Sequence, residues 1–359
     1  MGILFILFCG TSVVAAFFLF FAFYFTRSSK SMPRSFDELK WEIIWQYHGI
    51  RGLVEDAILK PKNRVDLISL EGKVAVITGG NRGIGLRVVE KLMKCDMTVV
   101  MGVRNPKEAE DNVENLIDVG SMKGKIFYER LDTGSMQSVR RFAKFVQSKF
   151  SKVDILINNA GIMASPFQIT EDGFESQLAV NYLGHFLLTH LLLPQLKAGG
   201  TKECNSRVVN VSSCVHLIGN INFDDLHGKK YYYPPVAYNQ SKLAQVLFTR
   251  YLQKVLNKDE ANNVQIYAVH PGVVDTDLFC HSSTTYIPWF KKIFFKTPEQ
   301  GSRTITYAAI SPRLEGKGGS YLSNCTLVKI SSLAKDLGLG EKFFQVTCDM
   351  LGIEDFFAV

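Results

Sequence analysis

The sequence has no cysteine pattern that would bind zinc or form a disulfide framework. Its seven cysteines are an odd, scattered set without a Cys-x-x-Cys pair. Its seven histidines show no spacing that would bring metal ligands onto a shared face, so no metal is predicted. The zinc-stabilised and disulfide-stabilised classes are therefore excluded, and a reducing compartment fits best.

Repeats and low-complexity tracts are also absent from the 359 residues. The 41 Lys and Arg residues outnumber the 34 Asp and Glu residues, but no long basic run is interleaved with aromatic residues, so we expect no nucleic acid partner. A composition of 47% hydrophobic and 21% charged residues is typical of a folded protein with one large or two ordinary domains.

Charged side chains are missing from residues 2–25, which are rich in Phe, Leu, Val, Ile and Ala. At about 1.5 Å per residue, a helix of this length would cross a hydrocarbon core of roughly 30 Å. We predict a retained transmembrane anchor over residues 1–26 rather than a cleaved signal peptide, because the stretch exceeds a signal core and no basic residue precedes it. Arg27, Lys30 and Arg34 follow it, which predicts a single-pass protein of an endoplasmic-reticulum-type membrane with a cytosolic catalytic domain.

Residues 27–69 are predicted to form an amphipathic linker region. A Ser35-x-x-Glu38 capping box precedes apolar residues that recur every three or four positions, which indicates one or two helices between residues 35 and 60, broken near Gly49 and Gly52. Their apolar face would lie either on the bilayer interface or against the catalytic domain. Pro61 and the polar residues 62–64 mark a linker. The apolar positions are Phe36, Leu39, Ile43, Tyr47, Ile50, Val54, Ala57 and Ile58.

Residues 70–359 alternate apolar strands with helical periods, which predicts an α/β fold with a doubly wound parallel sheet of the Rossmann type. The expected strands lie near residues 73–78, 97–101, 126–130, 153–157, 206–211, 264–269 and 319–322. The expected helices lie near residues 84–94, 106–118, 135–149, 172–196, 237–256 and 298–310. This region would be the dinucleotide-binding catalytic domain.

A glycine-rich turn joins the first of these strands to the first helix. A side chain at Gly79, Gly83 or Gly85 would hold the backbone away from a pyrophosphate, whose charge is favoured by the free N–H groups at the start of a helix. A glycine turn with no ligand is the alternative. The candidate cofactor-binding residues of this loop are Gly79, Asn81, Arg82, Gly83, Ile84 and Gly85.

Two further stretches have polar residues at informative places. Residues 158–161 follow an apolar strand, so they would lie at the carboxyl edge of the sheet, where doubly wound folds bind ligands. Tyr238 and Lys242 are four residues apart at the start of a helical period, which places the phenol and the ammonium on one face. Either stretch alone would be an ordinary turn or a solvated helix.

Several motifs occur together and in order: TGGNRGIG at 78–85, Asp132, NNAG at 158–161, Asn181, Ser212-Ser213, YNQSK at 238–242 and Pro271-Gly272. This combination resembles the short-chain dehydrogenase/reductase family from about residue 70 nearly to the C-terminus. The phrases NYLGHFLLT at 181–189 and SKLA at 241–244 resemble its retinol-dehydrogenase-like branch. The resemblance implies an oxidoreductase that interconverts a lipid alcohol, isoprenoid or retinoid-like, and its aldehyde or ketone.

Hydride transfer from an alcohol also requires a base for the hydroxyl proton. Tyr238 can serve if its pKa, near 10 in water, is brought toward neutrality, and Lys242 and a positive nicotinamide ring are the available causes. The resemblance assigns Ser213 to the substrate oxygen and Asn181 to a proton relay toward Lys242. The interval from Ser213 to Tyr238 is longer than usual in the family, which predicts a loop inserted beside the cleft.

The choice of cofactor depends on the turn after the second strand. An acidic residue there would accept the ribose hydroxyls of NAD, but Val103 and Arg104 stand at this turn, and Arg82 lies in the glycine loop. Two guanidinium groups would meet the 2′-phosphate of NADP, so NADP(H) is favoured and NAD(H) stays possible. The resemblance implies that the cofactor also contacts Asp132, Asn159, Ala160, Gly161, Tyr238, Lys242, Pro271, Gly272 and Thr276.

Residues 279–296 combine eight large apolar side chains with Lys291, Lys292 and Lys296, which is typical of an apolar lid with a basic rim. A core helix is the alternative. A wide apolar lid beside a membrane anchor favours a lipid-like substrate. The competing hypotheses are a reductase of small carbonyl compounds and a non-catalytic dinucleotide-binding scaffold, and a homo-oligomer is possible.

Overall fold

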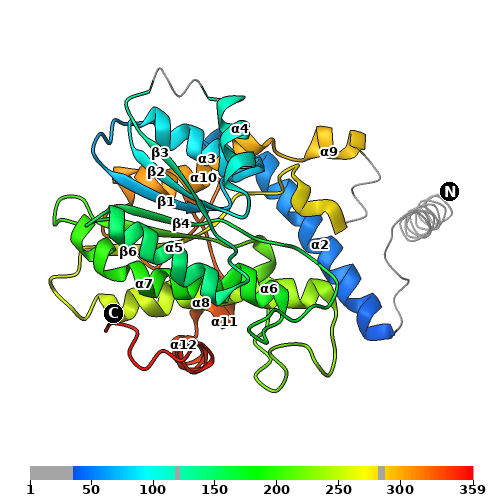
Figure 1. Ribbon diagram of the computed structural model, residues 1–359. Coiled ribbons are helices and arrows are strands. Elements are labelled where there is room, and N and C mark those ends of the chain that lie inside the picture. Colours follow the sequence, from blue (N-terminus) through cyan, green and yellow to red (C-terminus); the bar gives the residue numbers. More distant parts are fainter. Residues whose placement is uncertain (1–34, 118–121, 282–287, 359) are drawn as a thin grey trace.

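The computed structural model describes residues 35–117, 122–281 and 288–358, and its centre is an eight-stranded sheet in the order β3-β2-β1-β4-β5-β6-β7-β8 (Figure 1). Neighbouring strands pair in parallel, except that β7 and β8 are antiparallel. The direction of winding reverses between β1 and β4, which confirms the predicted doubly wound Rossmann-type sheet. The strands are β1 Val74–Thr78, β2 Thr98–Val103, β3 Ile126–Arg130, β4 Ile155–Asn158, β5 Ser206–Val211, β6 Val264–His270, β7 Tyr321–Ser323 and β8 Thr326–Leu327.

Helices cover both faces of the sheet. As a result, the strands β1, β4, β5 and β6 are buried along their whole length. One hydrophobic core joins the sheet to α5, α7, α8 and α12, and a second core on the opposite face joins it to α3, α4 and α10 (Figure 1). The helices are α3 Gly83–Lys94, α4 Pro106–Glu114, α5 Met136–Lys149, α6 Ser176–Leu178, α7 Gly184–Gly199, α8 Pro234–Leu256, α9 Pro288–Phe294, α10 Pro298–Ile310, α11 Ser332–Lys335 and α12 Leu337–Leu351.

The segment predicted as one helix over residues 172–196 is divided, so that prediction was wrong. At its start, Glu175 pairs with Ile169 in an isolated antiparallel bridge. The short helix α6 then leads through a π-helical turn, η3 Ala179–Leu183, into α7. Such turns inside helices are frequent at functional sites, and this one contains Asn181.

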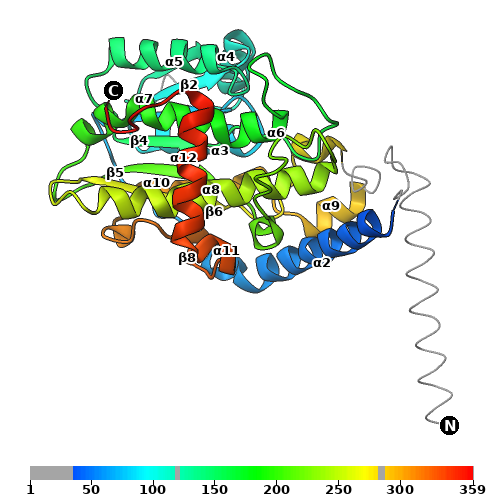
Figure 2. The ribbon, with the colours of Figure 1, turned by 90° about the horizontal axis from the view of Figure 1, so that it is seen from below.

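The C-terminal segment forms a layer that the sequence did not predict. α12 lies against α8, and Figure 2 shows it crossing the outside of the helical layer. Phe344 and Phe356 pack with Phe186 and Phe248 in one aromatic cluster, and Phe343 stacks on Tyr182 beside it. This layer buries one side of α7 and α8, and so stabilises the helix that carries Tyr238.

Residues 36–59 form one continuous helix, α2 Phe36–Leu59, capped by Ser35 as expected. The predicted break near Gly49 and Gly52 was wrong. Gly52 is a packing residue: a Cβ atom there would lie 3.2 Å from Val273 Cγ2 and 3.5 Å from Cys214 Sγ. Glycine at this position therefore lets the helix approach the catalytic domain closely.

The face of α2 that docks on the domain is polar. Glu42 accepts a hydrogen bond of 2.7 Å from the Tyr233 hydroxyl, and Asp56 forms an ion pair of 2.7 Å with Lys296. The predicted linker after the helix is also docked, because the buried Asn63 side chain donates to the Gln300 carbonyl at 2.9 Å. The helix therefore packs against the domain mainly through polar groups. The predicted apolar face is largely exposed, so the alternative in which that face packs against the catalytic domain was wrong.

The predicted anchor over residues 1–26 lies outside the described residues. Among the helices within residues 35–117, 122–281 and 288–358, none is long and apolar enough to cross a membrane.

Candidate functional site

The glycine loop between β1 and α3 has the backbone shape that the sequence predicted. Gly79 and Gly83 have φ angles of 68° and 54°, in the left-handed region that disfavours side chains. A Cβ atom on Gly85 would overlap the Gly79 carbonyl oxygen and approach Asn159 Nδ2 to 2.7 Å. Arg82 precedes α3 without capping it through its side chain, so the first N–H groups of the helix face the loop. These features fit a dinucleotide pyrophosphate.

Thr78 fixes the glycine loop to residues 158–161. Its hydroxyl oxygen accepts hydrogen bonds from the N–H groups of Asn159 and Ala160 at 3.0 and 2.9 Å. The Thr78 hydroxyl also lies 2.9 Å from Nε2 of the buried His185. Burial lowers the pKa of His185 to about 3, so its ring is neutral and can accept the Thr78 proton. His185 was not predicted, because nothing in its sequence position links it to the glycine loop.

Tyr238 and Lys242 lie together near the start of α8, as predicted, and both are buried. Lys242 Nζ is 5.4 Å from the centre of the Tyr238 ring and donates to the Val211 carbonyl at 2.9 Å. Ser213 follows β5 and caps the short turn η4 Cys214–Ile218, and its hydroxyl also bonds the Tyr238 side chain. The structure therefore brings together three residues that are up to 29 positions apart.

Asn181 joins this group from the π-helical turn. Its side chain donates to Ser241 Oγ at 2.9 Å and to the Ile162 carbonyl at 3.0 Å, and it accepts from the Ile162 N–H at 2.9 Å. A Cβ atom on Gly161 would lie 3.2 Å from Asn181 Oδ1 and 3.6 Å from Lys242 Nζ. Asn181 and Lys242 thus meet across Gly161, close enough for a shared water molecule.

Burial controls the protonation of this group in the chain alone. Burial raises the pKa of Tyr238, although the hydrogen bond with Ser213 opposes the shift. Burial lowers the pKa of Lys242 to about 7. The chain alone therefore holds Tyr238 as a phenol. It does not supply the lowered Tyr238 pKa that is expected of a base in alcohol oxidation.

The candidate cofactor residues outside the glycine loop lie along the carboxyl edge of the sheet. Arg104 is exposed directly after β2, and Arg82 is exposed and pairs with Asp277 at 3.3 Å. Asp132 is exposed after β3 and accepts from the Gly134 N–H at 2.9 Å. Thr276 reaches the glycine loop, because a Cβ atom on Gly83 would lie 3.3 Å from its methyl carbon.

An apolar cluster surrounds Tyr238, and part of it was not predicted. The ring of Trp45, from α2, lies edge-on to the Tyr238 ring with centroids 5.9 Å apart. Leu278 and Phe279, from the turn η5 Asp277–His281, pack into the same cluster. The remaining members are Met163, Ala164, Cys214, Val215 and Ile218. Trp45 is three residues after Glu42, so the two side chains share the docked face of α2. This spacing is the sequence signal that could have placed Trp45 beside the site.

Pro271 and Gly272 are held by the ion pair between α2 and the domain. Asp56 accepts from the Val273 N–H at 2.8 Å, and Lys296 donates to the Pro271 carbonyl at 3.3 Å. Gly272 has a φ angle of 98°, and a Cβ atom there would approach Lys296 Nζ to 2.5 Å and Asp56 Oδ2 to 2.6 Å. The predicted lid over residues 279–296 begins in the turn η5 and continues as α9. Residues 282–287 between them lie outside the described residues.

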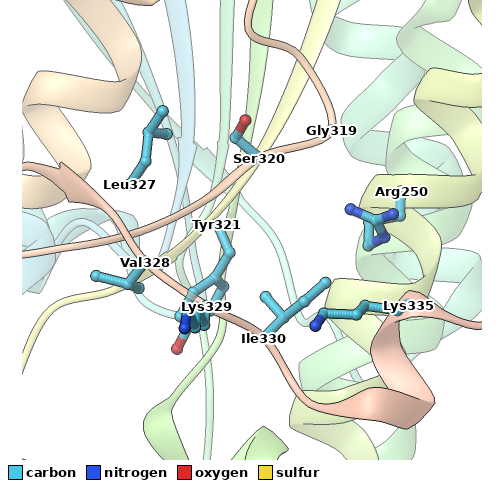
Figure 3. A pocket seen from close by; sticks show the side chains of 9 residues that line it. All are labelled: Arg250, Gly319, Ser320, Tyr321, Leu327, Val328, Lys329, Ile330 and Lys335. Carbon is cyan, nitrogen blue, oxygen red and sulfur yellow. The ribbon is translucent and has the colours of Figure 1, made fainter.

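A separate hollow of about 330 Å³ lies beside β7 and β8 (Figure 3). It is lined by side chains that include Arg250, Lys329 and Lys335, none of which belongs to the predicted site. Among the described residues, no group of three or more His, Cys, Asp or Glu side chains could hold a metal ion.

A glycine cradle at the carboxyl edge of a doubly wound sheet, beside a buried tyrosine and lysine, defines a nicotinamide-dependent oxidoreductase. The chain belongs to the short-chain dehydrogenase family, whose pattern it matches over residues 73–286. The predicted membership is thereby confirmed.

The chain is similar to human retinol dehydrogenase 11, with 38% identity over 287 residues that cover 80% of this chain and 88% of the relative. It is 39% identical to human polyprenol dehydrogenase over 289 residues, which cover 79% of this chain and 86% of the relative. A crystal structure of 3-ketoacyl-(acyl-carrier-protein) reductase from Brucella melitensis complexed with NADH has a TM-score of 0.54 and 25% identity, and the match covers 71% of this chain and 97% of that chain.

Proposed function

We propose that the protein interconverts a lipid alcohol, isoprenoid or retinoid-like, and its aldehyde or ketone. The observation that carries this proposal is the apolar cluster that Trp45, Leu278 and Phe279 build around Tyr238. Such a surface favours a long apolar substrate over a small polar one. The similarity to a retinol dehydrogenase and a polyprenol dehydrogenase supports the same substrate class.

The glycine loop would hold the pyrophosphate of a nicotinamide dinucleotide, and Asn159 to Gly161 with Thr276 would line its nicotinamide end. When bound, the nicotinamide ring supplies the acceptor or the donor of the hydride. The chain's own residues handle the proton. In oxidation, Tyr238 would first lose its own proton and then, as a phenolate, take the hydroxyl proton of the alcohol; in reduction the phenol would give its proton to the carbonyl oxygen, and Ser213 would hold that oxygen in both directions.

Lys242 and Asn181 would complete the proton path. Lys242 Nζ and Asn181 Oδ1 meet at Gly161, so a proton lost by Tyr238 can pass to a water molecule held between them. The burial that raises the pKa of Tyr238 keeps it as a phenol, which is the form that reduction of an aldehyde requires.

Tyr238→Phe tests this mechanism. The variant should bind dinucleotide like the wild type and lose at least 100-fold in turnover of retinal or a polyprenal, since it keeps the ring and removes the proton. The exposed Tyr231→Phe is the matched control and should keep full turnover. Equal turnover of Tyr238→Phe and the wild type would contradict the mechanism.

We further propose that NADP(H) is preferred, because the exposed Arg104 stands at the end of β2 where an acid would select NAD. Arg82 is the weaker candidate, since it already pairs with Asp277. Arg104→Asp should weaken NADP(H) binding far more than NAD(H) binding, measured by fluorescence titration of both cofactors. An unchanged preference would remove Arg104 as the residue that reads the 2′-phosphate.

The membrane location is also a proposal. Residues 1–26 would anchor the protein in an endoplasmic-reticulum-type membrane, with the catalytic domain in the cytosol, because Arg27, Lys30 and Arg34 flank the apolar stretch on its downstream side. Protease added to intact microsomes should digest the domain without detergent. The chain has glycosylation acceptor sequences at Asn239 and Asn324, so full protection together with an endoglycosidase-sensitive mass would reverse the orientation.

A further inference from the structure

The outer face of α2 carries a row of exposed apolar side chains. Their exposed fractions range from 48% to 80%, and they recur at intervals of three, four or seven residues. The row extends over about 33 Å of helix. We call it the outer stripe, and its members are Phe36, Ile43, Tyr47, Ile50, Val54 and Ile58.

The orientation of α2 that exposes this stripe is fixed by specific contacts. The opposite face is held by the buried pair of Asp56 and Lys296, by Glu42 with Tyr233, and by the close approach of Gly52. Turning the helix to bury the stripe would leave two carboxylates without their partners. The usual amphipathic arrangement is therefore inverted, and a contiguous apolar patch of this kind marks an interaction surface.

The fully exposed charges along α2 and at its C-cap are mostly positive. Lys40 and Arg51 are exposed on the helix and Lys60 directly after it, whereas Glu42 and Asp56 are buried and Glu38 and Glu55 are half-buried. Asp37 is an exposed acid, at the first turn. Apolar side chains flanked by lysine and arginine match the boundary between acyl chains and anionic headgroups of a bilayer.

A second short helix, α9, is tied to α2 near its C-terminal end, because Lys296, two residues after α9, pairs with Asp56. Figure 1 shows α9 near that end of α2, and Figure 2 shows both helices at the same end of the domain. Trp289 and Ile293 of α9 are exposed, and so is Lys292. Tryptophan with lysine is the pairing that membrane interfaces favour.

The chain upstream of α2 connects this surface to an apolar segment. Residues 2–25 contain no charged side chain, and only ten residues separate Phe25 from Phe36. Ten residues span at most about 36 Å, so the start of α2 stays close to the end of that segment. If residues 2–25 span a bilayer, the outer stripe would be held close enough to contact that bilayer.

We infer that the outer stripe of α2, with Trp289 and Ile293 of α9, lies on an anionic lipid bilayer at headgroup depth. This inference rests on the proposed membrane location but not on the proposed reaction. Since Trp45 is on the inner face of the same helix, the apolar cluster around Tyr238 would lie about one helix diameter, roughly 10 Å, from the lipid. A lipid substrate would then enter beside α2 without crossing water.

The full-length protein in liposomes of phosphatidylcholine and phosphatidylserine tests the inference. Cysteine introduced in Ile50→Cys and labelled with an environment-sensitive fluorophore reports on the stripe, and Leu327→Cys, which has similar exposure on another surface, is the matched control. Cys204 and Cys280 are exposed and are replaced by serine beforehand. Nitroxide-labelled lipids should quench the probe at position 50 at least threefold more than the probe at position 327.

Three outcomes decide the question. Strong quenching at position 50 supports the bilayer surface. An aqueous emission spectrum without quenching overturns it. A blue-shifted spectrum without quenching also overturns it, because a second copy of the chain or its own residues 2–25 would then cover the stripe.

A kinetic experiment separates this inference from the proposed reaction. The variant Ile43→Glu/Ile50→Glu/Val54→Glu should raise KM for a bilayer-dissolved lipid aldehyde at least tenfold and leave turnover of a water-soluble aldehyde unchanged. An unchanged lipid KM would contradict the surface. If neither substrate reacts with the wild type, the proposed reaction fails, while the quenching result still stands or falls by itself.

Discussion

The proposed cofactor half and the proposed substrate half of the site are built in different ways. The cofactor half is made mostly of backbone from a single stretch, Thr78 to Gly85, together with Asn159 and Ala160, which Thr78 ties to it. The substrate half is made of side chains from α2, η4 and η5, whose contacts join residues about 190 to 270 positions apart, such as Glu42 with Tyr233 and Asp56 with Asn324. A phosphate site can thus be encoded locally, whereas the apolar cluster around Tyr238 requires contacts from distant parts of the chain.

The largest expected effect is a loss of stability when the contact that holds α2 in the substrate half is removed. Asp56→Asn should lower the free energy of unfolding by about 3–5 kcal/mol, because Lys296 would be left buried without its carboxylate. Urea denaturation followed by circular dichroism measures the change. Asp37→Asn, exposed on the same helix, is the control and should change stability by less than about 0.5 kcal/mol. A loss below about 1 kcal/mol would show that the ion pair does not hold α2.

The cofactor half should break through backbone geometry. Gly85→Ala should weaken dinucleotide binding at least 100-fold, roughly 2.7 kcal/mol, because the added Cβ overlaps the Gly79 carbonyl oxygen. Isothermal titration calorimetry gives the affinity. Gly49→Ala, whose Cβ would meet nothing within 4 Å, should leave the affinity unchanged and add up to about 1 kcal/mol of stability to α2. Undiminished affinity in Gly85→Ala would place the pyrophosphate elsewhere.

Removing the Trp45 ring from α2 tests whether the substrate half of the site is independent of the cofactor half. Trp45→Ala should raise KM for a lipid aldehyde about tenfold with no change in dinucleotide affinity, because the edge-on contact with Tyr238 and the apolar surface are lost. Trp41→Ala, one turn earlier, is the control of the same residue type. A parallel loss of dinucleotide affinity would mean that the two halves are not independent.

The most gradual effect concerns Lys242, which both halves share. Its pKa in the folded chain is about 7, below the ordinary value of 10.5, so between pH 7 and pH 9 the unfolded chain binds more protons than the folded chain. Stability without cofactor should therefore rise with pH in this window, by up to about 1.4 kcal/mol per pH unit relative to Lys242→Met. Below pH 7 the two proteins should run parallel. Parallel curves throughout would show that Lys242 keeps an ordinary pKa.

The same contrast explains how much the sequence could predict. The glycine loop, the Tyr238 and Lys242 pair and the strands from β1 to β7 depend on local patterns, and the structure has them close to the expected places. The continuous α2, its polar docked face and the layer of α12 depend on partners far along the chain. Gly52 illustrates the limit, because a glycine that packs against Val273 looks in sequence like a helix breaker.

The most direct test of the central claim measures hydride transfer to two kinds of carbonyl. Full-length protein in liposomes would receive dinucleotide deuterated at the transferable position, with either a polyprenal or a small aromatic ketone, and mass spectrometry would follow the products. The proposed reaction predicts that the lipid alcohol gains one deuterium and forms with a kcat/KM at least tenfold higher than the small alcohol. A higher kcat/KM for the small ketone, or a lipid product without deuterium, would contradict it.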